Sequence, residues 1–447
     1  MSRVVVVGGG LAGMAAALEA ADRGARVTLV ERREKLGGLT WSFQRKGLWF
    51  DNGQHVFLRC CTAYRTFLDR LGATDQVVLQ DRLDVPVLAP GGRRSAIRRS
   101  GLPAPLHLGP ALARYRFLTP ADRLRSVRAA LALRRLDPAD PALDEVTFGE
   151  WLARHGQRPA AVERLWDLIA LPTVNVRAAE ASLALAVKVF RTGMLDAADA
   201  GDIGWSSVPL GQLHGTNGAR ALAAAGVGVR LGVPVTGLAR GAAGWVVSTG
   251  DGDLVADDVI VAAPPPVAAG LVPPGALGPV EDLGASPIVN VHLVFDRRVT
   301  DLAFCACVDS PVQFVFDRTG SSGLPAGQYL AISLSGADAD IGRRPEALVR
   351  DYHQALGRIF PAARTARLVD GAVSREHAAT FRGRPGTAAL RPDARTPVPG
   401  LFVAGAWCAT GWPATMEGAV RSGLAAARAA VPRSPGAGRT TDLEAAA

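Results

Sequence analysis

The N-terminus of the chain sets the strongest constraint on its fold. Val4–Val7 form the unbroken apolar run of a buried strand, and Gly8–Gly13 directly after it fit the pattern GxGxxG. The alanine-rich segment Leu11–Asp22 predicts a helix, and Arg26–Val30 predict a second buried strand. Strand, glycine turn, helix and strand in this order predict an α/β domain that binds a dinucleotide.

Three glycines of this turn are required for physical reasons. Gly8 permits a tight turn, Gly10 lets a pyrophosphate approach the backbone, and Gly13 lets the helix pack closely on the strand. The first N–H groups of the helix can bind the phosphates, and Glu31, after the second strand, can accept hydrogen bonds from a ribose diol. The cofactor contacts predicted here are Gly8, Gly10, Leu11, Ala12, Gly13, Glu31 and Arg32.

A second glycine pair, Gly37 and Gly38, follows the acidic residue. The segment Arg32–Gly38 resembles the extended fingerprint of FAD enzymes in the amine oxidase and carotenoid desaturase superfamily. FAD lies extended through such proteins, so a second glycine-rich loop is needed to admit its ribityl and phosphate portion. The resemblance implies non-covalent FAD and an α/β fold, in which a Rossmann-like FAD-binding domain of the amine oxidase/glutathione reductase type carries an interleaved mixed α+β substrate domain.

The C-terminal region extends this resemblance. Gly400–Trp407 read as an apolar strand, and Met416–Val420 (MEGAV) begin a helix that points at the isoalloxazine ring in the superfamily. The superfamily usually has an acidic residue after the glycine of this strand, but here Ala406 stands there, which puts one ribityl contact in doubt. The further contacts that the resemblance implies are Gly37, Gly38, Leu39, Val235, Gly405, Ala406, Ala414, Thr415 and Met416.

We expect two interleaved domains. The FAD-binding domain is predicted to comprise residues 1–75, 208–270 and 386–431, the substrate domain 76–207 and 271–385, and a flexible tail 432–447. Val227–Leu238 and Trp245–Ala263 read as strands of the middle cofactor segment, whereas the insertion 76–207 is helical in pattern.

One predicted helix of that insertion, from Pro120 to Leu136, is amphipathic and basic. Leu124, Val127 and Leu131 share a face. The flanking arginines are Arg123, Arg125, Arg128, Arg134 and Arg135. Such a helix can lie in a membrane interface or be an ordinary solvated helix, and the pattern alone leaves both readings open.

Composition narrows the partners and the compartment. The net charge of +9 favours acidic partners, but aromatic residues are few and no nucleic-acid-binding motif is present, so we expect lipid and no nucleic acid. The five cysteines match neither a metal site nor a disulfide framework. Six prolines interrupt the uncharged run Val259–Val280, so no transmembrane helix is expected. We expect a cytoplasmic protein, with possible peripheral contact at the inner face of the membrane.

Four further segments narrow the resemblance to one bacterial family. They are Phe50–His55, Leu171–Asn175, Glu180–Gly193 and Gly411–Thr415. With them the chain resembles the hydroxysqualene dehydroxylases, also called squalene-associated FAD-dependent desaturases, over roughly residues 3 to 430. The resemblance implies reductive removal of a hydroxyl group from hydroxysqualene, an apolar C30 isoprenoid, by hydride from reduced FAD, usually in hopanoid synthesis. It does not indicate the electron donor.

Loss of hydroxide needs a proton donor. His55, just after the predicted strand through Asp51, is the candidate acid, and Asp51 could orient it or substitute for it. The alternative is structural, because a histidine beside a turn is often only hydrogen bonded, and Asp51 with Asn52 can cap the turn.

Three other functions share this scaffold. A carotenoid-type desaturase would remove hydride from a polyene. An amine oxidase would need an aromatic cage around the amine, and the chain has only four tyrosines from which to build one. An isoprenoid carrier without redox activity, as in Rab escort proteins, is disfavoured by the intact glycine motifs.

Overall fold

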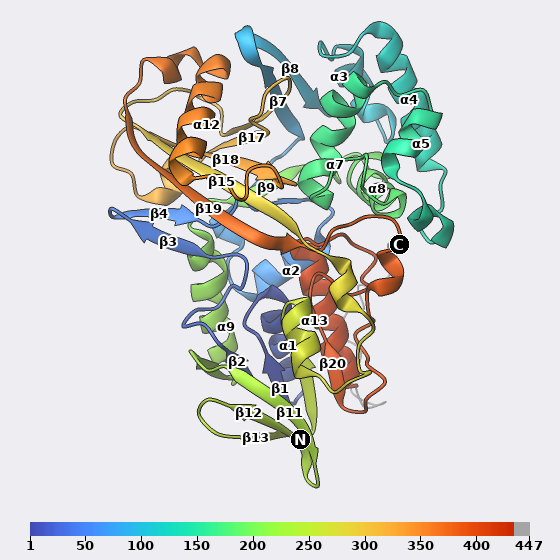
Figure 1. The fold of residues 1–447 in the computed structure, drawn as a ribbon, viewed down its shortest axis with the longest axis vertical. Helices are drawn as coiled ribbons and strands as arrows, with labels where there is room; N and C mark the ends of the chain where they lie inside the picture. Colours follow the sequence, from blue (N-terminus) through green and yellow to red (C-terminus); the bar gives the residue numbers. More distant parts are fainter. Residues whose placement is uncertain (433–447) are drawn as a thin grey trace.

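The computed structural model describes residues 1–432, so the predicted tail, apart from its first residue, lies outside the described residues. A five-stranded parallel sheet occupies the lower half of the molecule in Figure 1. Its strands, in spatial order, are β10 (Gly228–Leu231), β2 (Arg26–Glu31), β1 (Arg3–Val7), β14 (Asp258–Val261) and β20 (Leu401–Val403). The predicted N-terminal strands and helix are therefore confirmed, and segments far apart in the chain complete the sheet.

Two helices cover this sheet in direct contact with each other. They are α1 (Leu11–Asp22) and α13 (Met416–Ala430). A Cβ atom on Gly423 would lie 2.1 Å from the carbonyl oxygen of Ala12, so only glycine permits this crossing. The N-terminal and C-terminal cofactor motifs are thereby packed against each other.

A second, seven-stranded sheet lies in the upper half of Figure 1, with α12 (Pro345–Ile359) packed on it. Its strands, in spatial order, are β19 (Leu368–Thr380), β15 (Ser286–Phe295), β18 (Gln328–Ser335), β17 (Phe314–Asp317), β16 (Phe304–Cys307), β7 (Asp84–Ala89) and β8 (Arg93–Arg98). β15 pairs antiparallel with both β18 and β19 and is almost wholly buried.

The insertion 76–207, expected to be helical in pattern, also contains strands. Residues 84–98 form the β7–β8 hairpin, because Gly91 and Gly92 both adopt φ of about +79° and reverse the chain. The helices of this insertion follow afterwards, at the upper right of Figure 1. They are α3 (Gly109–Ala113), α4 (Pro120–Arg134), α5 (Phe148–Arg154), α6 (Pro159–Ala161), α7 (Asp167–Val174) and α8 (Leu183–Phe190).

Small sheets connect the two halves. The hairpin β3 (Ser42–Arg45) and β4 (Leu48–Asp51) leads into β5 (Val56–Leu58). β5 and β6 (Val77–Leu79) both pair with β9 (Ile203–Ser206), so the end of the helical insertion returns beside residues 51–58. The remaining α-helices are α2 (Thr62–Arg70), α9 (Asn217–Ala224), α10 (Pro265–Leu271) and α11 (Thr319–Ser322).

The middle segment differs in one detail from the predicted strands. Val227–Leu238 divides at Gly232, which adopts φ +72°, into β10 of the parallel sheet and β11 (Val235–Gly241). β11 pairs with β12 (Gly244–Thr249), which pairs in turn with β13 (Leu254–Ala256). The domain boundaries themselves stay a prediction.

The described residues contain no helix with the length and apolarity that a membrane span requires. The uncharged run that begins at Val259 instead forms most of β14, followed by the short helix α10.

Candidate active site

The first glycine turn is shaped by close backbone packing. A Cβ on Gly8, which adopts φ +111°, would lie 2.5 Å from the carbonyl oxygen of Ala262, and one on Gly13 would lie 1.9 Å from that of Gly8. Gly10 differs, because the only neighbouring atom within 4 Å of its Cβ position is Gly38 Cα, at 3.7 Å. No side chain caps α1, so its first-turn N–H groups are available to an anionic ligand.

The second glycine pair lies directly against this turn. Gly37 donates its N–H to the carbonyl oxygen of Gly9 at 2.9 Å. Gly38 adopts φ +58°, and a Cβ on it would come within 2.8 Å of Gly10 Cα. Thr40 donates its hydroxyl to the Gly37 carbonyl at 2.8 Å and holds the loop. The two glycine loops therefore form one continuous backbone surface.

Glu31 ends β2 beside these loops, and its side chain is buried. One carboxylate oxygen accepts the N–H of Gly9 at 2.7 Å and the other accepts that of Arg33 at 2.8 Å. Val233 donates its N–H to the Glu31 backbone carbonyl oxygen at 3.0 Å, so the segment that leads to Val235 starts beside the end of β2. The side chains of Arg32 and Leu39 are exposed.

The connection from β20 to α13 is organised by Arg391, a partly buried arginine that sequence patterns do not reveal. Arg391 donates to the carbonyl oxygens of Trp407, Cys408 and Trp412. Burial lowers the pKa of this guanidinium to about 10, which leaves it cationic at neutral pH. Gly405 donates its N–H to the Ser422 hydroxyl at 2.8 Å, and this ties the end of the strand to the helix. Ala406 and Ala414 are partly buried.

The N-terminus of α13 carries its own acidic residue. The Thr415 hydroxyl caps the helix by accepting the N–H of Gly418 at 3.2 Å. Glu417, almost fully buried, accepts the N–H of Tyr64 at 2.7 Å and pairs with Arg421 at 2.6 Å. These contacts fix the helix start against α2; that Met416 and this terminus face a flavin ring stays a prediction.

Asn52 joins the cofactor loops to the upper sheet. It is buried, and its side-chain amide donates to the Leu39 carbonyl at 2.7 Å and to the Glu376 carboxylate on β19 at 2.9 Å. Its own carbonyl accepts hydrogen bonds from Asn290 at 3.0 Å and from Ser374 at 2.8 Å. The turn at residues 51–55 is thus held between the second glycine loop and strands β15 and β19.

Asp51 forms a buried ion pair with Arg318, at 2.8 Å. Its other oxygen accepts hydrogen bonds from the Ser42 hydroxyl at 2.6 Å and from the Leu210 N–H at 2.9 Å. Arg318 also donates to the Ser206 carbonyl at 2.7 Å. Both carboxylate oxygens of Asp51 are therefore occupied by donors from other segments.

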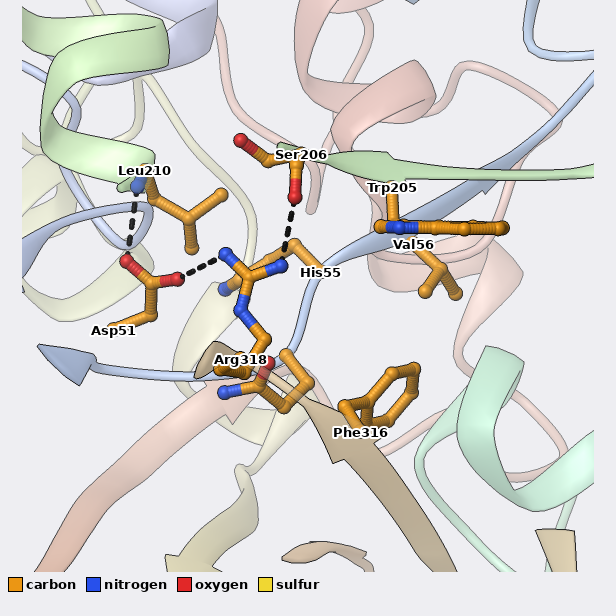
Figure 2. A pocket seen from close by; sticks show the side chains of 9 residues that line it. Asp51, His55, Val56, Trp205, Ser206, Leu210, Phe316 and Arg318 are labelled. Atoms are coloured by element: carbon orange, nitrogen blue, oxygen red, sulfur yellow. Dashed lines mark hydrogen bonds and ion pairs between the residues drawn. The ribbon is translucent and has the colours of Figure 1, made fainter. Parts of the chain in front are cut away.

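His55 lies beside this ion pair, at a small cavity of about 10 Å³ (Figure 2). Asp51, His55 and Arg318 line one side of the cavity, and Val56, Trp205 and Phe316 line the other. Burial lowers the pKa of His55, while the carboxylates of Asp51 and Glu376 oppose that shift. The cavity has room for about one water molecule and is too small for a large organic substrate.

The fold and the two glycine loops define a flavin-dependent oxidoreductase with a Rossmann-like cofactor domain. A family model, "Flavin containing amine oxidoreductase", matches residues 11–431, and the chain belongs to that family. Both the predicted α/β fold class and the predicted FAD cofactor are confirmed, as is the resemblance at the level of the superfamily.

The relatives of this chain include enzymes of two types. A hydroxysqualene dehydroxylase from Rhodopseudomonas palustris is 29% identical over 96% of this chain and 98% of its own. A zeta-carotene desaturase from Arabidopsis thaliana is 24% identical over 94% of this chain and 84% of its own. The solved structure of a putrescine oxidase double mutant matches 97% of this chain and 99% of its own with a TM-score of 0.72, at 20% identity.

The residues present fit FAD. The uncapped terminus of α1 offers N–H groups to a diphosphate, and the open side of Gly10 admits it. Glu31 retains lone pairs for a ribose diol, because each of its oxygens accepts one backbone N–H.

Proposed function

We propose that this oxidoreductase removes the hydroxyl group of hydroxysqualene reductively and yields squalene, with FAD held non-covalently by the predicted cofactor residues. The observation that carries the proposal is the position of residues 51–55, the segment that most favours the dehydroxylase family. Through Asn52 this turn bonds both the Leu39 carbonyl of the cofactor loop and Glu376 of the upper sheet. A substrate bound between the cofactor and that sheet would meet this turn.

The chemistry divides between cofactor and protein. Reduced FAD, when bound, supplies a hydride. The chain would supply a proton to the departing hydroxyl group, and His55 is the candidate donor. Its ring folds back over the turn, since a Cβ atom built on Gly53 would lie 3.1 Å from His55 Nε2. Asp51 is better suited to position this region, since Arg318, Ser42 and Leu210 already occupy its oxygens.

An apolar wall suits the substrate class. Val56, Trp205 and Phe316 would keep water from a delocalised allylic cation. Because the cavity beside them holds about one water, an isoprenoid of C30 size requires that these side chains move apart on binding.

The decisive experiment is anaerobic. The purified flavoprotein is reduced, mixed with hydroxysqualene, and followed by its flavin spectrum and by analysis of the extracted lipid. We expect squalene in step with flavin reoxidation. Gly10→Glu, which places a carboxylate in the diphosphate site, should abolish flavin binding. Hydroxysqualene left unchanged by a flavin-replete, reducible protein would refute the proposal.

A carotenoid-type desaturase is the second candidate, favoured by the match to zeta-carotene desaturases over most of the chain. Oxidised protein incubated with a polyene substrate and a quinone acceptor separates the two, since only a desaturase would extend the conjugated chromophore.

An amine oxidase has less support from the site. All four tyrosines are buried, and each hydroxyl is hydrogen bonded within the protein. Their partners are His214 for Tyr64, the Arg164 carbonyl for Tyr115, His292 for Tyr329 and Asp340 for Tyr352. None of them is free to form the cage that an amine substrate needs.

A further inference from the structure

Helix α4 exposes three large apolar residues and buries two polar ones. Leu124, Val127 and Leu131 are 53%, 38% and 41% exposed. By contrast, Asp122 and Ser126 are buried against the protein. In an ordinary solvated helix the large apolar side chains face the protein, so the exposure of Leu124, Val127 and Leu131 favours the membrane-interface reading of this helix.

The inward face of α4 is held by specific polar contacts, which fix the rotation of the helix. Asp122 forms an ion pair with Arg158, whose Nε lies 2.8 Å from the carboxylate. Ser126 donates its hydroxyl to Gln157 at 3.0 Å. Rotating the leucines inward would break both contacts, and Ala129 and Leu133 already fill the buried side.

The outward residues form one stripe with a basic edge. At 100° per residue, Leu124, Val127 and Leu131 lie within about 60° of one another, and Arg128 and Arg135 lie beside them. Both arginines are exposed, and neither forms an ion pair with any residue in the range 1–432. We call Leu124, Val127, Arg128, Leu131 and Arg135 the α4 face.

We propose that the α4 face is a docking surface for the headgroup region of an anionic lipid bilayer. Leucine and valine side chains would enter the boundary between headgroups and acyl chains, while the arginines reach the lipid phosphates. The charge complementarity argues for lipid rather than a second copy of this chain, because two such faces would bring unpaired arginines together. The net charge of +9 acts in the same direction.

The position of α4 gives the bound protein an orientation. In Figure 1, α4 lies at the upper edge of the molecule and the parallel sheet lies at the opposite end. The helical insertion would therefore face the bilayer, and the parallel sheet would lie on the side away from it. This proposal does not depend on which reaction the enzyme catalyses.

Sedimentation with vesicles tests the proposal. The flavin-loaded protein is mixed with vesicles of phosphatidylcholine, either pure or containing phosphatidylglycerol, at low and high salt. We expect binding to the mixed vesicles that weakens with salt. Leu124→Ser with Leu131→Ser should reduce this binding about tenfold, and Arg128→Glu with Arg135→Glu at least tenfold.

Matched controls come from exposed residues elsewhere. Val369→Ser removes an apolar side chain that is 53% exposed on β19, and Arg344→Glu with Arg358→Glu reverses two exposed charges at α12. These variants should bind like the wild type. Flavin absorbance and the thermal midpoint show that each variant is folded.

Three outcomes would overturn the proposal. The first is equal binding of the α4-face and control variants to anionic vesicles. The second is no binding by the wild type. The third is a dimer, measured by light scattering, that Leu124→Ser with Leu131→Ser converts to a monomer while vesicle binding is absent. Vesicle binding is measured without substrate, so its failure is distinct from failure of the proposed reaction.

Discussion

Arg318 and Asp51 lie 267 positions apart in the chain, yet their side chains meet at 2.8 Å where neither is more than 8% exposed. Removing the guanidinium would leave a buried carboxylate without its cation. We expect Arg318→Met to lower the free energy of unfolding by about 3–5 kcal/mol.

The ion pair can be tested by a double-mutant cycle in urea. Asp51→Asn combined with Arg318→Met should cost less than the sum of the two single changes, because neither charge is then left alone. Arg3→Met, which breaks an exposed pair with Asp257, serves as the control and should change stability far less. Equal effects of the exposed and buried pairs would contradict the prediction.

The crossing of α1 and α13 predicts a strict requirement at Gly423. Alanine there would place a Cβ 2.1 Å from the Ala12 carbonyl oxygen and force the two helices apart. We expect Gly423→Ala to destabilise the protein by about 1–3 kcal/mol and to lower the flavin content of the purified protein. Gly270→Ala in α10, with no atom within 4 Å of the new Cβ, should retain wild-type flavin content.

The role of His55 can be read from a pH profile. Because burial lowers its pKa below the usual 6.5, the protonated form accumulates only as the pH falls. If His55 donates the proton, flavin reoxidation by hydroxysqualene should speed up about tenfold per pH unit as the pH falls toward that pKa. His55→Ala should flatten this dependence and leave flavin binding intact. The same slope in both proteins would remove His55 as the acid.

Two further buried histidines predict acid sensitivity of the fold. Burial lowers the pKa of His214 and of His292 to about 3. The unfolded chain therefore binds more protons below pH 6.5, so stability falls as the pH falls, by about 1.4 kcal/mol per pH unit for each histidine.

Urea unfolding at pH 7 and pH 5 measures this effect. His292→Gln should be less stable than wild type at pH 7 but should lose about 2 kcal/mol less between the two pH values. His377→Gln, at an exposed site on β19, should lose as much as the wild type. An identical loss of stability between pH 7 and pH 5 in all three proteins would show that His292 takes up no proton on unfolding.

The parts of the fold that depend on near neighbours could be predicted from the sequence. The predicted strand, glycine turn and helix at residues 3–22 are confirmed. An apolar run, a helical period and the positions of glycines each depend only on residues close together in the chain. A helical pattern averaged over the whole insertion does not predict the hairpin β7–β8, whose only local signal is the glycine turn at Gly91–Gly92.

The candidate site could be predicted only in its glycine loops and its turn at residues 51–55. Arg318, Glu376 and Arg391 carry no motif, and each acts through contacts with distant segments. Glu376, for instance, accepts a hydrogen bond from Asn52, which lies 324 positions earlier in the chain. The outward direction of Leu124 likewise follows only from the contacts that Asp122 makes in the structure. A helical period shows which residues share a face, but it does not show which face is buried.

The order of strands in the parallel sheet bears on how the cell makes this protein. β1 is central, but β20, which completes the sheet beside β14, begins only at residue 401. A ribosome therefore releases the first glycine turn and α1 long before α13, the helix that packs on α1, has been made. The nascent chain exposes unpaired strand edges throughout that interval. Flavin loading should be a late event that follows termination, and expression without enough flavin should yield aggregated chains more readily than soluble apoprotein.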